Sequence, residues 1–230
     1  MTRDRSIIES TAVVIPAYNA ARHLAGVVAA VSAHVARERV IVVDDGSADD
    51  TAGVARGAGA LVIEHGVNRG KGAALCTGIL AALERGWRYA ITLDADGQHD
   101  PDEIPNFVAR WVETGADIIV GDRMASTKDM PFVRLATNRV TSWVVSALAR
   151  RRVPDSQNGY RMISTELFAR LPLVTTRYDT ESEMLIRAGR LGATIASVPV
   201  ETIYGDEESS IRPLVDTARF FRMVVRSLFW

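Results

Sequence analysis

The stretch that decides the fold is Ile91-Thr92-Leu93-Asp94-Ala95-Asp96-Gly97-Gln98-His99. The apolar run over residues 89–93 has the length and composition of a buried strand, and it ends abruptly in two carboxylates one residue apart. A chain with glycine at position 97 can turn there and bring both carboxylates to one point. Two carboxylates and an amide oxygen form a hard-oxygen set suited to Mg²⁺ or Mn²⁺. We therefore predict a metal site with three ligands: Asp94, Asp96 and Gln98.

The composition is that of a soluble globular protein with a real core. Of 230 residues, 47% are hydrophobic and 24% charged, and the net charge of -1 argues against a dedicated nucleic-acid binder. The single cysteine, Cys76, excludes a disulfide framework, and its helical spacing to Ile79, Leu80 and Leu83 predicts a core position. No leader-like segment and no run of about 18 apolar residues is present, so we expect the chain in the cytoplasm.

Strand and helix signals alternate through the first half of the chain. Strands are predicted at 11–15, 39–43, 60–64, 89–93 and 117–120, and helices at 20–35, 50–58, 73–85 and 101–113. This spacing indicates βαβ units and a mostly parallel central sheet flanked by helices, an α/β fold. The second half is predicted to hold a long helix, a strand, a helix, a strand and a last helix, at 131–152, 160–164, 178–191, 193–200 and 214–230. With no linker or repeat, we predict one domain over residues 1–230.

Other polar segments follow the predicted strands. The second strand ends in Asp44-Asp45-Gly46-Ser47, a glycine-rich loop spans Gly66 to Gly72, and Arg123 follows the fifth strand. The carboxyl ends of parallel strands form the ligand-binding edge of an open α/β sheet. Backbone N–H groups of a glycine-rich loop can approach phosphate, and Lys71 adds positive charge there. These segments therefore predict a phosphate-bearing ligand beside the metal site.

Five motifs together carry a family resemblance. They are Val14-Ile-Pro-Ala-Tyr-Asn19, Val42-Val-Asp-Asp-Gly-Ser-Ala-Asp-Asp-Thr51, Asn68-Arg-Gly-Lys-Gly72, Asp94-Ala-Asp-Gly-Gln-His99 and Gly121-Asp-Arg123. In this order they resemble the family 2 glycosyltransferases with a GT-A fold, and within them the dolichol- or polyprenyl-phosphate sugar transferases. The resemblance covers about residues 11–210. It implies an inverting transfer of one sugar from a UDP- or GDP-sugar, with Mg²⁺ or Mn²⁺.

The resemblance assigns the donor site to residues 11–123. A first loop would frame the nucleotide, Asp44 or Asp45 would read the base or ribose, and the glycine-rich loop would lie beside the nucleotide. The side chain of Arg69 is either part of that loop's contact or simply solvated. The remaining donor-site residues that the resemblance implies are Pro16, Ala17, Tyr18, Asn19, Asn68, Lys71 and the metal motif with Asp94, Ala95, Asp96 and Gln98.

The resemblance assigns the acceptor to residues 124–210. Arg123 can reach a phosphate from the same sheet edge, and Arg134 and Arg139 on the long helix are further candidate phosphate contacts. Asp155 would face the sugar and Arg161 would pair with it, unless this segment is a structural turn held by a salt bridge.

The long helix also carries a periodic pattern. Its polar positions Arg134, Asn138 and Ser142 form one stripe, which predicts a solvated face. We expect the opposite face, with Val140 and Trp143, to be buried.

The acceptor decides the chemistry. A polyprenyl phosphate is already an anion and needs no strong general base, whereas a sugar hydroxyl needs a carboxylate base. Candidates lie near the start of one helix, at Asp179, Glu181 and Glu183. Glu183 is expected to be an ordinary acid of a helix N-terminus. The residues we expect to act on the reacting groups are Asp96, Arg123, Asp155 and Glu181.

The last helix is basic and amphipathic. Its arginines are Arg212, Arg219, Arg222 and Arg226. Residues 211–230 could therefore lie on the inner face of the cytoplasmic membrane, or pack on the domain or on a second subunit.

Rival functions are a transferase acting on a carbohydrate hydroxyl, a non-catalytic sugar-nucleotide binding module and a nucleotidyltransferase. The metal motif argues against the binding module, and the first loop lacks the glycine- and arginine-rich signature of the nucleotidyltransferases.

Overall fold

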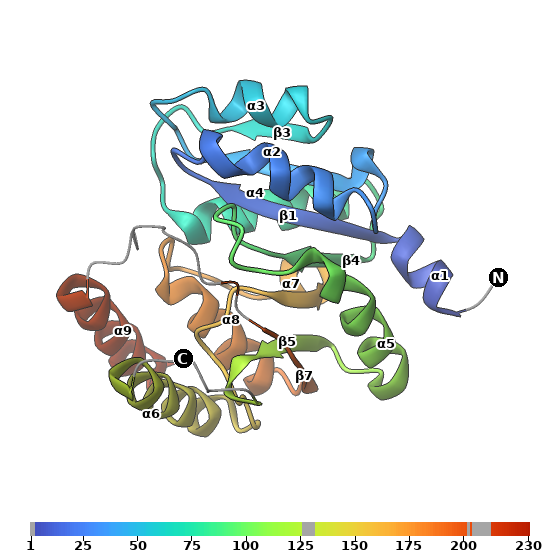
Figure 1. Ribbon diagram of the computed structural model, residues 1–230. Coiled ribbons are helices and arrows are strands. Elements are labelled where there is room, and N and C mark those ends of the chain that lie inside the picture. Colours follow the sequence, from blue (N-terminus) through green and yellow to red (C-terminus); the bar gives the residue numbers. More distant parts are fainter. Residues whose placement is uncertain (1–2, 126–131, 202, 204–212) are drawn as a thin grey trace.

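The computed structural model describes residues 3–125, 132–201, 203 and 213–230. Arg212, predicted in the last helix, lies outside them. Within the described residues, one sheet of seven strands lies between layers of helices (Figure 1). The strands are β1 (Thr11–Ala17), β2 (Val40–Asp44), β3 (Leu61–Glu64), β4 (Tyr89–Thr92), β5 (Ile118–Asp122), β6 (Arg161–Ser164) and β7 (Ile195–Pro199).

Helices connect these strands. The α-helices are α1 (Arg3–Glu9), α2 (Ala21–Val31), α3 (Thr51–Gly57), α4 (Lys71–Glu84), α5 (Ile104–Thr114), α6 (Phe132–Ala149), α7 (Thr165–Ala169), α8 (Asp179–Arg190) and α9 (Pro213–Ser227). Short 3-10 turns are η1 (Arg37–Arg39), η2 (Pro101–Glu103) and η3 (Arg123–Ala125). The predicted elements are confirmed with small shifts of their ends, and α1 and α7 are additions that the sequence patterns did not indicate.

The strand order is β3-β2-β1-β4-β6-β5-β7, and every neighbouring pair is parallel except the two that involve β6. The predicted mostly parallel sheet is therefore confirmed. β6 runs antiparallel between β4 and β5, with Arg161 opposite Thr92 and Val120. The start of β6 consequently lies at the same edge of the sheet as the ends of β4 and β5.

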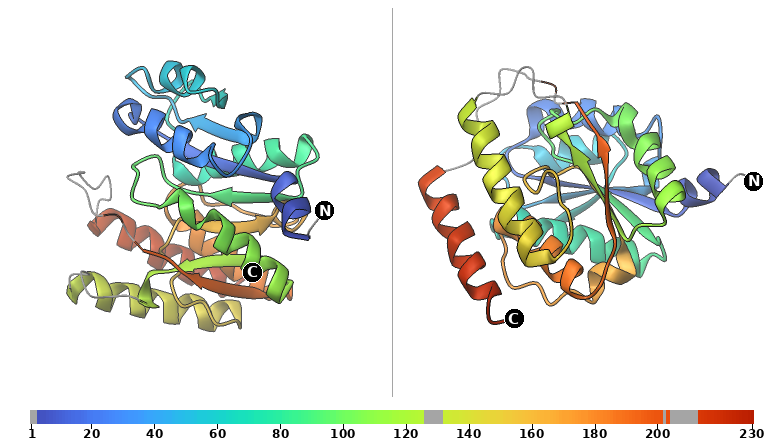
Figure 2. Two further views of the ribbon diagram at one scale, coloured as in Figure 1. Left: turned by 45° about the vertical axis from the view of Figure 1, so that its right-hand side comes forward. Right: turned by 90° about the horizontal axis from the view of Figure 1, so that it is seen from below.

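Two apolar layers enclose the sheet (Figures 1 and 2). Helices α1, α2, α3 and α5 cover one face, and α4, α7 and α8 cover the other, with α6 and α9 packed beside α8. Alternate side chains of β1 serve the two layers, since Val13 and Ile15 join one cluster and Val14 the other. This burial on both faces explains why the central strands read as continuous apolar runs.

The prediction for α6 was wrong about which face is buried. Asn138 and Ser142 are buried, whereas Val140 is 61% exposed and Trp143 is 72% exposed. The reason lies in the segment 153–158 beneath the helix, whose backbone needs partners. The Ser142 hydroxyl accepts from the N–H of Ser156 at 2.9 Å, so the polar stripe faces inward to bind this segment.

The first predicted loop is also shorter than expected, because β1 continues through Pro16 and Ala17. Pairing of β1 with β4 ends at Val14, while pairing with β2 continues to Ala17. A proline at position 16 fits because the β4 side has no partner strand there that would require its missing N–H.

Candidate functional site

The carboxyl ends of β1, β2, β4 and β5 and the start of antiparallel β6 meet at one edge of the sheet. Five segments that the sequence singled out begin or end there: 16–19, 44–47, 94–99, 121–123 and 155–161. The loop 65–70 follows β3 to the same edge and leads into α4. The topology thus brings together residues up to 140 positions apart in the chain.

A lysine and two acids form the centre of this edge. The Nζ atom of Lys71, the first residue of α4, lies 2.6 Å from Oδ1 of Asp94 and 3.3 Å from Oε1 of Glu181. The Nε2 atom of His99 lies 3.5 Å from the other oxygen of Asp94. Lys71 also faces the ring of Tyr178, 5.7 Å from its centroid. We refer to Lys71, Asp94, Glu181 and His99 as the lysine cluster.

Proximity of opposite charges dominates the electrostatics of the lysine cluster. Burial alone would lower the pKa of Lys71, but Asp94 and Glu181 outweigh it and raise that pKa above its usual value. Burial would likewise raise the pKa of Asp94, yet Lys71 and His99 hold that pKa well below its usual range. Both groups are therefore charged at neutral pH.

The predicted metal ligands lie on the turn after β4. Gly97 has φ +79°, which confirms the predicted turn, and Oδ1 of Asp96 accepts the backbone N–H of Gln98 at 3.0 Å. In the part of the chain that the structure describes, no three His, Cys, Asp or Glu side chains form a metal centre. Because Asp94 is engaged by Lys71 and His99, the oxygens that suit a divalent cation are those of Asp96 and Gln98. Mg²⁺ commonly takes one or two carboxylates and completes its shell with water and substrate phosphate, so this pair fits such an ion.

The second acid after β2 is tied to the glycine-rich loop. Asp45 is buried and accepts the backbone N–H groups of Arg69 at 2.9 Å and Gly70 at 2.7 Å. It also contacts Nδ1 of His65 at 2.7 Å, and Nε2 of His65 contacts Oγ1 of Thr77 on α4 at 2.9 Å. This network fixes the loop that presents Lys71.

Asp44 and Asn19 join the ends of β1 and β2. Asp44 is buried and accepts from the N–H of Ser47 at 3.0 Å. The Asn19 side chain accepts from the N–H of Ala48 at 2.8 Å, and its own N–H donates to the Ser47 hydroxyl at 2.8 Å. Asn19 has φ +51°, a conformation that asparagine tolerates better than most residues. Tyr18 beside it is exposed.

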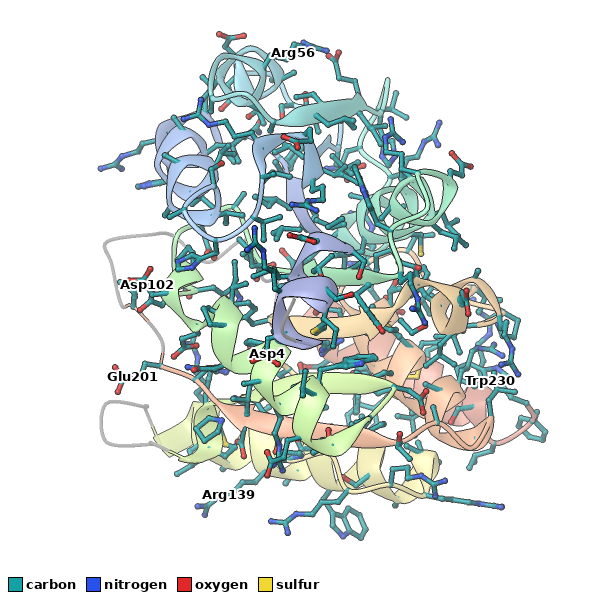
Figure 3. All side chains as sticks on the ribbon, turned by 90° about the vertical axis from the view of Figure 1, so that its right-hand side faces the viewer. Asp4, Arg56, Asp102, Arg139, Glu201 and Trp230 are labelled. Atoms are coloured by element: carbon teal, nitrogen blue, oxygen red, sulfur yellow. The ribbon has the colours of Figure 1, made fainter. Side chains whose placement is uncertain are left out.

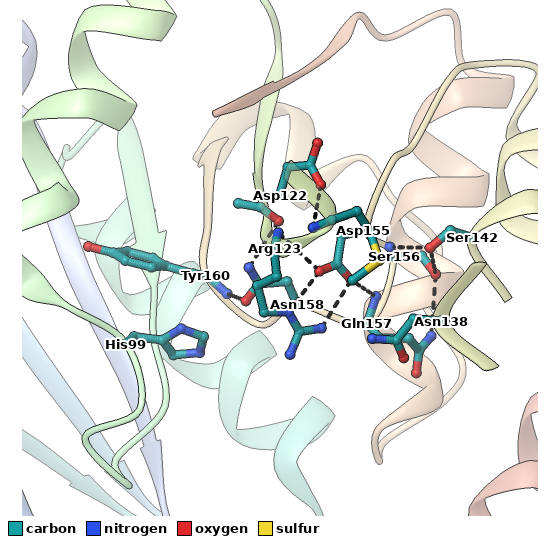
Figure 4. Close-up of polar contacts among 12 residues, drawn as sticks. His99, Asp122, Arg123, Asn138, Ser142, Asp155, Ser156, Gln157, Asn158 and Tyr160 are labelled. Carbon is teal, nitrogen blue, oxygen red and sulfur yellow. Dashed lines mark hydrogen bonds and ion pairs between the residues drawn. The ribbon is translucent and has the colours of Figure 1, made fainter. Parts of the chain in front are cut away.

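On the other side of the edge, Arg123 and Asp155 form a bidentate ion pair (Figure 4). Nε of Arg123 lies 2.7 Å from one oxygen of the fully buried Asp155 and Nη2 lies 3.0 Å from the other. The expected pairing of Asp155 with Arg161 was wrong, because Arg161 donates to the carbonyls of Glu181 and Ser156 at 3.0 and 2.8 Å. Arg161 is 1% exposed, so it braces the site from below.

The three acids of α8 have different surroundings. Glu181 belongs to the lysine cluster. Glu183 is fully buried, pairs with Arg187 at 2.6 Å and accepts the N–H of Thr175 at 2.8 Å, which makes it a structural group as expected. Burial raises the pKa of Asp179 above its usual value.

Two predicted residues lie away from the centre. Asn68 is exposed in the loop, where its side chain accepts from Nη1 of Arg177 at 3.4 Å. Arg134 is exposed on α6. Ala95, by contrast, is buried in the turn between the two motif acids.

Sequence reasoning missed three contributors to the site. His99 contacts Asp94, and its position next to Gln98 in the motif was the available signal. His65 braces Asp45, but a lone histidine after a strand gives no pattern. Gly159 approaches the lysine cluster so closely that a Cβ atom there would lie 3.1 Å from both Asp94 Oδ1 and Lys71 Nζ.

The sheet order, the single antiparallel strand and the acidic turn at the strand ends define a GT-A fold, the nucleotide-sugar-binding class of α/β domains. The family model described as glycosyl transferase family 2 matches residues 12–173, so the chain belongs to that family.

Two relatives have named activities. The UDP-N-acetylglucosamine–dolichyl-phosphate N-acetylglucosaminyltransferase of Methanococcus voltae is 33% identical over 213 residues, covering 83% of this chain and 84% of that protein. The polyprenol monophosphomannose synthase of Mycolicibacterium smegmatis is 28% identical over 204 residues, covering 84% and 77%. The chain is therefore similar to transferases named for polyprenyl or dolichyl phosphate.

Solved structures share the fold. Glucosyl-3-phosphoglycerate synthase from Mycobacterium tuberculosis, crystallised with Mn²⁺, UDP and glucosyl-3-phosphoglycerate, has a TM-score of 0.73 at 24% identity and covers 99% of this chain and 83% of its own. Mannosyl-3-phosphoglycerate synthase from Rubrobacter xylanophilus has a TM-score of 0.75 at 23% identity and covers 98% and 74%.

Proposed function

We propose that this protein transfers one sugar, with inversion, from a UDP- or GDP-sugar to a polyprenyl or dolichyl phosphate. In this proposal, residues 11–123 bind the donor and residues 124–210 shape the acceptor site. The two relatives named for dolichyl-phosphate and polyprenol transfer support this acceptor class. The neighbour crystallised with UDP and Mn²⁺ supports a nucleotide donor and a divalent cation.

The observation that carries the proposal is the engagement of the candidate bases by cations. Glu181 lies 3.3 Å from Nζ of Lys71, and Glu183 lies 2.6 Å from Nε of Arg187. A carboxylate held by a cation is a poor general base, since the cation stabilises its deprotonated form. A lipid phosphate is itself an anionic nucleophile, so it can attack the sugar at an edge that offers little base catalysis.

The charges at this edge also favour a divalent cation. The expected site residues there include six carboxylates (Asp44, Asp45, Asp94, Asp96, Asp155 and Glu181) but three side-chain cations, Lys71, Arg123 and Arg161. A diphosphate would be repelled by this excess of negative charge. Asp96 and Gln98 would hold Mg²⁺ or Mn²⁺, which when bound supplies positive charge to the diphosphate.

The chain's own residues then act as follows. Lys71, fixed by the loop that Asp45 anchors, faces the position where charge develops on the departing nucleotide. Arg123, oriented by its two bonds to Asp155, offers a cation toward the acceptor phosphate. Arg161 and Gly159 hold the backbone of the 155–161 segment against the lysine cluster.

The test is release of nucleoside diphosphate from a panel of UDP- and GDP-sugars with Mn²⁺ or Mg²⁺, with and without polyprenyl phosphate in detergent. We expect release from one donor that depends on the lipid and stops with EDTA. Release of pyrophosphate would indicate a nucleotidyltransferase. Donor binding without release, under every acceptor tested, would indicate a binding module.

A carbohydrate hydroxyl acceptor is the second candidate, and Asp179 is the observation that favours it. Its raised pKa, caused first by burial, suits a general base. Lipid-independent transfer to a sugar hydroxyl that is lost in Asp179→Asn would establish this alternative.

A peripheral position at a membrane is part of the proposal. Among the described residues, none of the helices combines the length and apolar character that crossing a bilayer requires. Helix α9 exposes Phe221, Val225 and Leu228 beside arginines, which suits contact with a lipid surface. Replacing the exposed Phe221 and Leu228 by serine should weaken vesicle binding while donor binding persists.

A further inference from the structure

A second concave surface lies outside the lysine cluster. A groove of about 840 Å³ opens along α6 and is bounded by residues 122–124 after β5 and by residues 150–154 after α6. Its described lining residues include none of the lysine cluster. The 122–124 segment contains Arg123 and the 150–154 segment leads into Asp155, so the groove lies on the other side of the segments that carry that ion pair.

The groove is strongly basic. Four arginines line it, Arg139, Arg150, Arg151 and Arg152, against one acid among its described lining residues, Asp122. Arg151 is fastened by bonds to the carbonyls of Ala193 and Gly192 at 3.1 and 3.2 Å. Arg139, Arg150 and Arg152 are exposed and form no ion pair with an acid in the described part of the chain. Figure 3 shows Arg139 pointing away from the body of the molecule.

An apolar ridge borders the groove. Trp143 lines it, and Val140 and Trp143 on the same side of α6 are 61% and 72% exposed because the helix turns its polar stripe inward. Exposed large apolar groups with a polar surround mark an interaction surface. Tryptophan next to arginine is the combination found where a protein meets the headgroup level of a bilayer.

The neighbouring helix presents the same chemistry. Helices α6 and α9 both contact α8 and lie side by side in every ribbon view (Figures 1 and 2). The outer side of α9 exposes Phe221, Val225 and Leu228, with Arg222 and Arg226 exposed between them. The apolar and basic side chains therefore extend over two adjacent helices.

We propose that the arginine groove is a binding site for the anionic headgroups of a lipid bilayer, with Trp143 inserted beside it at the interface. The groove's arginines attract negative headgroups, and the apolar ridge gains by leaving water, so one surface satisfies both features. A symmetric contact between two copies of the chain would place arginine against arginine, which disfavours that occupant. A soluble anion would leave Val140 and Trp143 in water. The proposal does not depend on which acceptor the enzyme uses.

The experiment measures partition of the full chain onto vesicles of phosphatidylcholine with and without 30% phosphatidylglycerol, a proportion set to about that of an anionic leaflet. We compare wild type with Arg139→Gln/Arg150→Gln/Arg152→Gln. Each arginine near an anionic surface contributes about fivefold, so we expect partition onto the anionic vesicles to fall about 100-fold. Binding of wild type should also weaken as salt rises.

A matched control removes three exposed arginines elsewhere, in Arg37→Gln/Arg85→Gln/Arg170→Gln. These residues lie near the opposite edge of the sheet, before β2 and β4 and after α7. The control carries the same net charge, so we expect it to partition within threefold of wild type. Equal partition of the groove variant and the control variant would overturn the proposal.

Trp143 provides an independent readout. Lipids brominated on their acyl chains should quench wild-type fluorescence, and Trp143→Phe should remove most of that quenching even if the arginine variant folds poorly. Wild-type binding that ignores phosphatidylglycerol would refute the headgroup site. Sedimentation of a dimer that Trp143→Glu dissociates would instead make this face a subunit interface and refute the proposal.

Discussion

Nζ of Lys71 lies 2.6 Å from Oδ1 of Asp94, so the first acid of the metal motif is neutralised by the first residue of α4. The two residues are 23 positions apart and belong to different strand-end loops. Their contact leaves Asp96 and Gln98 as the oxygens best suited to a cation, and it divides the work of the motif between a lysine and a metal.

Replacing Lys71 by methionine should lower both stability and activity. Asp94 and Glu181 would lose the cation between them, and breaking such a pair from one side costs about 2 kcal/mol or more of unfolding free energy. Sugar transfer should fall about 100-fold because the leaving diphosphate loses a stabilising charge. Urea unfolding and nucleotide release measure the two effects. Arg85→Gln at the other end of α4 is the control and should match wild type in both.

The ion pair also predicts an acid dependence of stability. The folded-state pKa of Asp94 lies below its unfolded value, so the unfolded chain binds a proton first as the pH falls. The contribution of Asp94 is therefore complete above about pH 4 and is lost as the pH falls through the folded pKa. We expect the difference in unfolding free energy between wild type and Asp94→Asn to be constant from pH 5 to 7, a range chosen about one unit above the unfolded pKa, and to shrink below pH 4. An unchanged difference at pH 3 would contradict this account.

Asp96→Asn should abolish transfer, by about 100-fold or more, with little change in stability. Asp96 lies partly exposed on the turn after β4 and serves no apolar cluster, so its loss should weaken cation binding more than folding. Activity titrated with Mn²⁺, alongside thermal unfolding, checks both halves of the expectation. Asp102→Asn, an exposed acid nearby, should keep near wild-type activity. Full turnover of Asp96→Asn at the wild-type metal concentration would remove the metal assignment.

Two acids one helical step apart should behave oppositely. Glu183→Gln should lower the unfolding free energy by about 2–3 kcal/mol, because the buried carboxylate holds Arg187 and the N–H groups of Val174 and Thr175. Glu181→Gln should change stability less and transfer more, since it alters the surroundings of Lys71. The result that would reverse these roles is a stable, inactive Glu183→Gln.

Cys76 should be inert in the folded protein. Burial, and then the nearby carboxylate of Glu183, raises the pKa of its thiol from 9.0 to about 11. The thiolate fraction at pH 8 should then be about 100-fold below that of an ordinary cysteine, and the reaction with a thiol reagent correspondingly slow. Labelling in native buffer and in guanidinium chloride measures the contrast, and rapid native labelling would contradict the buried placement.

Local sequence patterns predicted most of the fold because burial on both faces leaves a direct trace. The strands β1, β2, β4 and β5 read as apolar runs, and glycine and acid residues mark where they end. Those same strand ends placed the candidate site at one edge before any coordinates, since parallel strands align their carboxyl ends. The acidic turn itself required Gly97, whose positive φ the sequence anticipated.

Periodicity failed where a helix packs on polar backbone. The stripe of Asn138 and Ser142 faces inward because the 153–158 segment beneath α6 needs hydrogen bonds, and the sequence of α6 holds no trace of that neighbour. The same limit applies to pairing, since Asp155 could reach Arg123 or Arg161 until the position of β6 was known.

The sequence by itself thus determined an α/β sheet, its ligand-binding edge and the acids of the turn after β4, because these follow from strand period, turn chemistry and chain direction. Tertiary structure alone decided which charges meet: Lys71 with Asp94 and Glu181, Arg123 with Asp155, and His65 with Asp45. Charge pairs form between residues distant in the chain, and their partners depend on the order of strands and the direction of β6. The exposure of Trp143 has the same origin, because a helix buries whichever side its neighbours can satisfy.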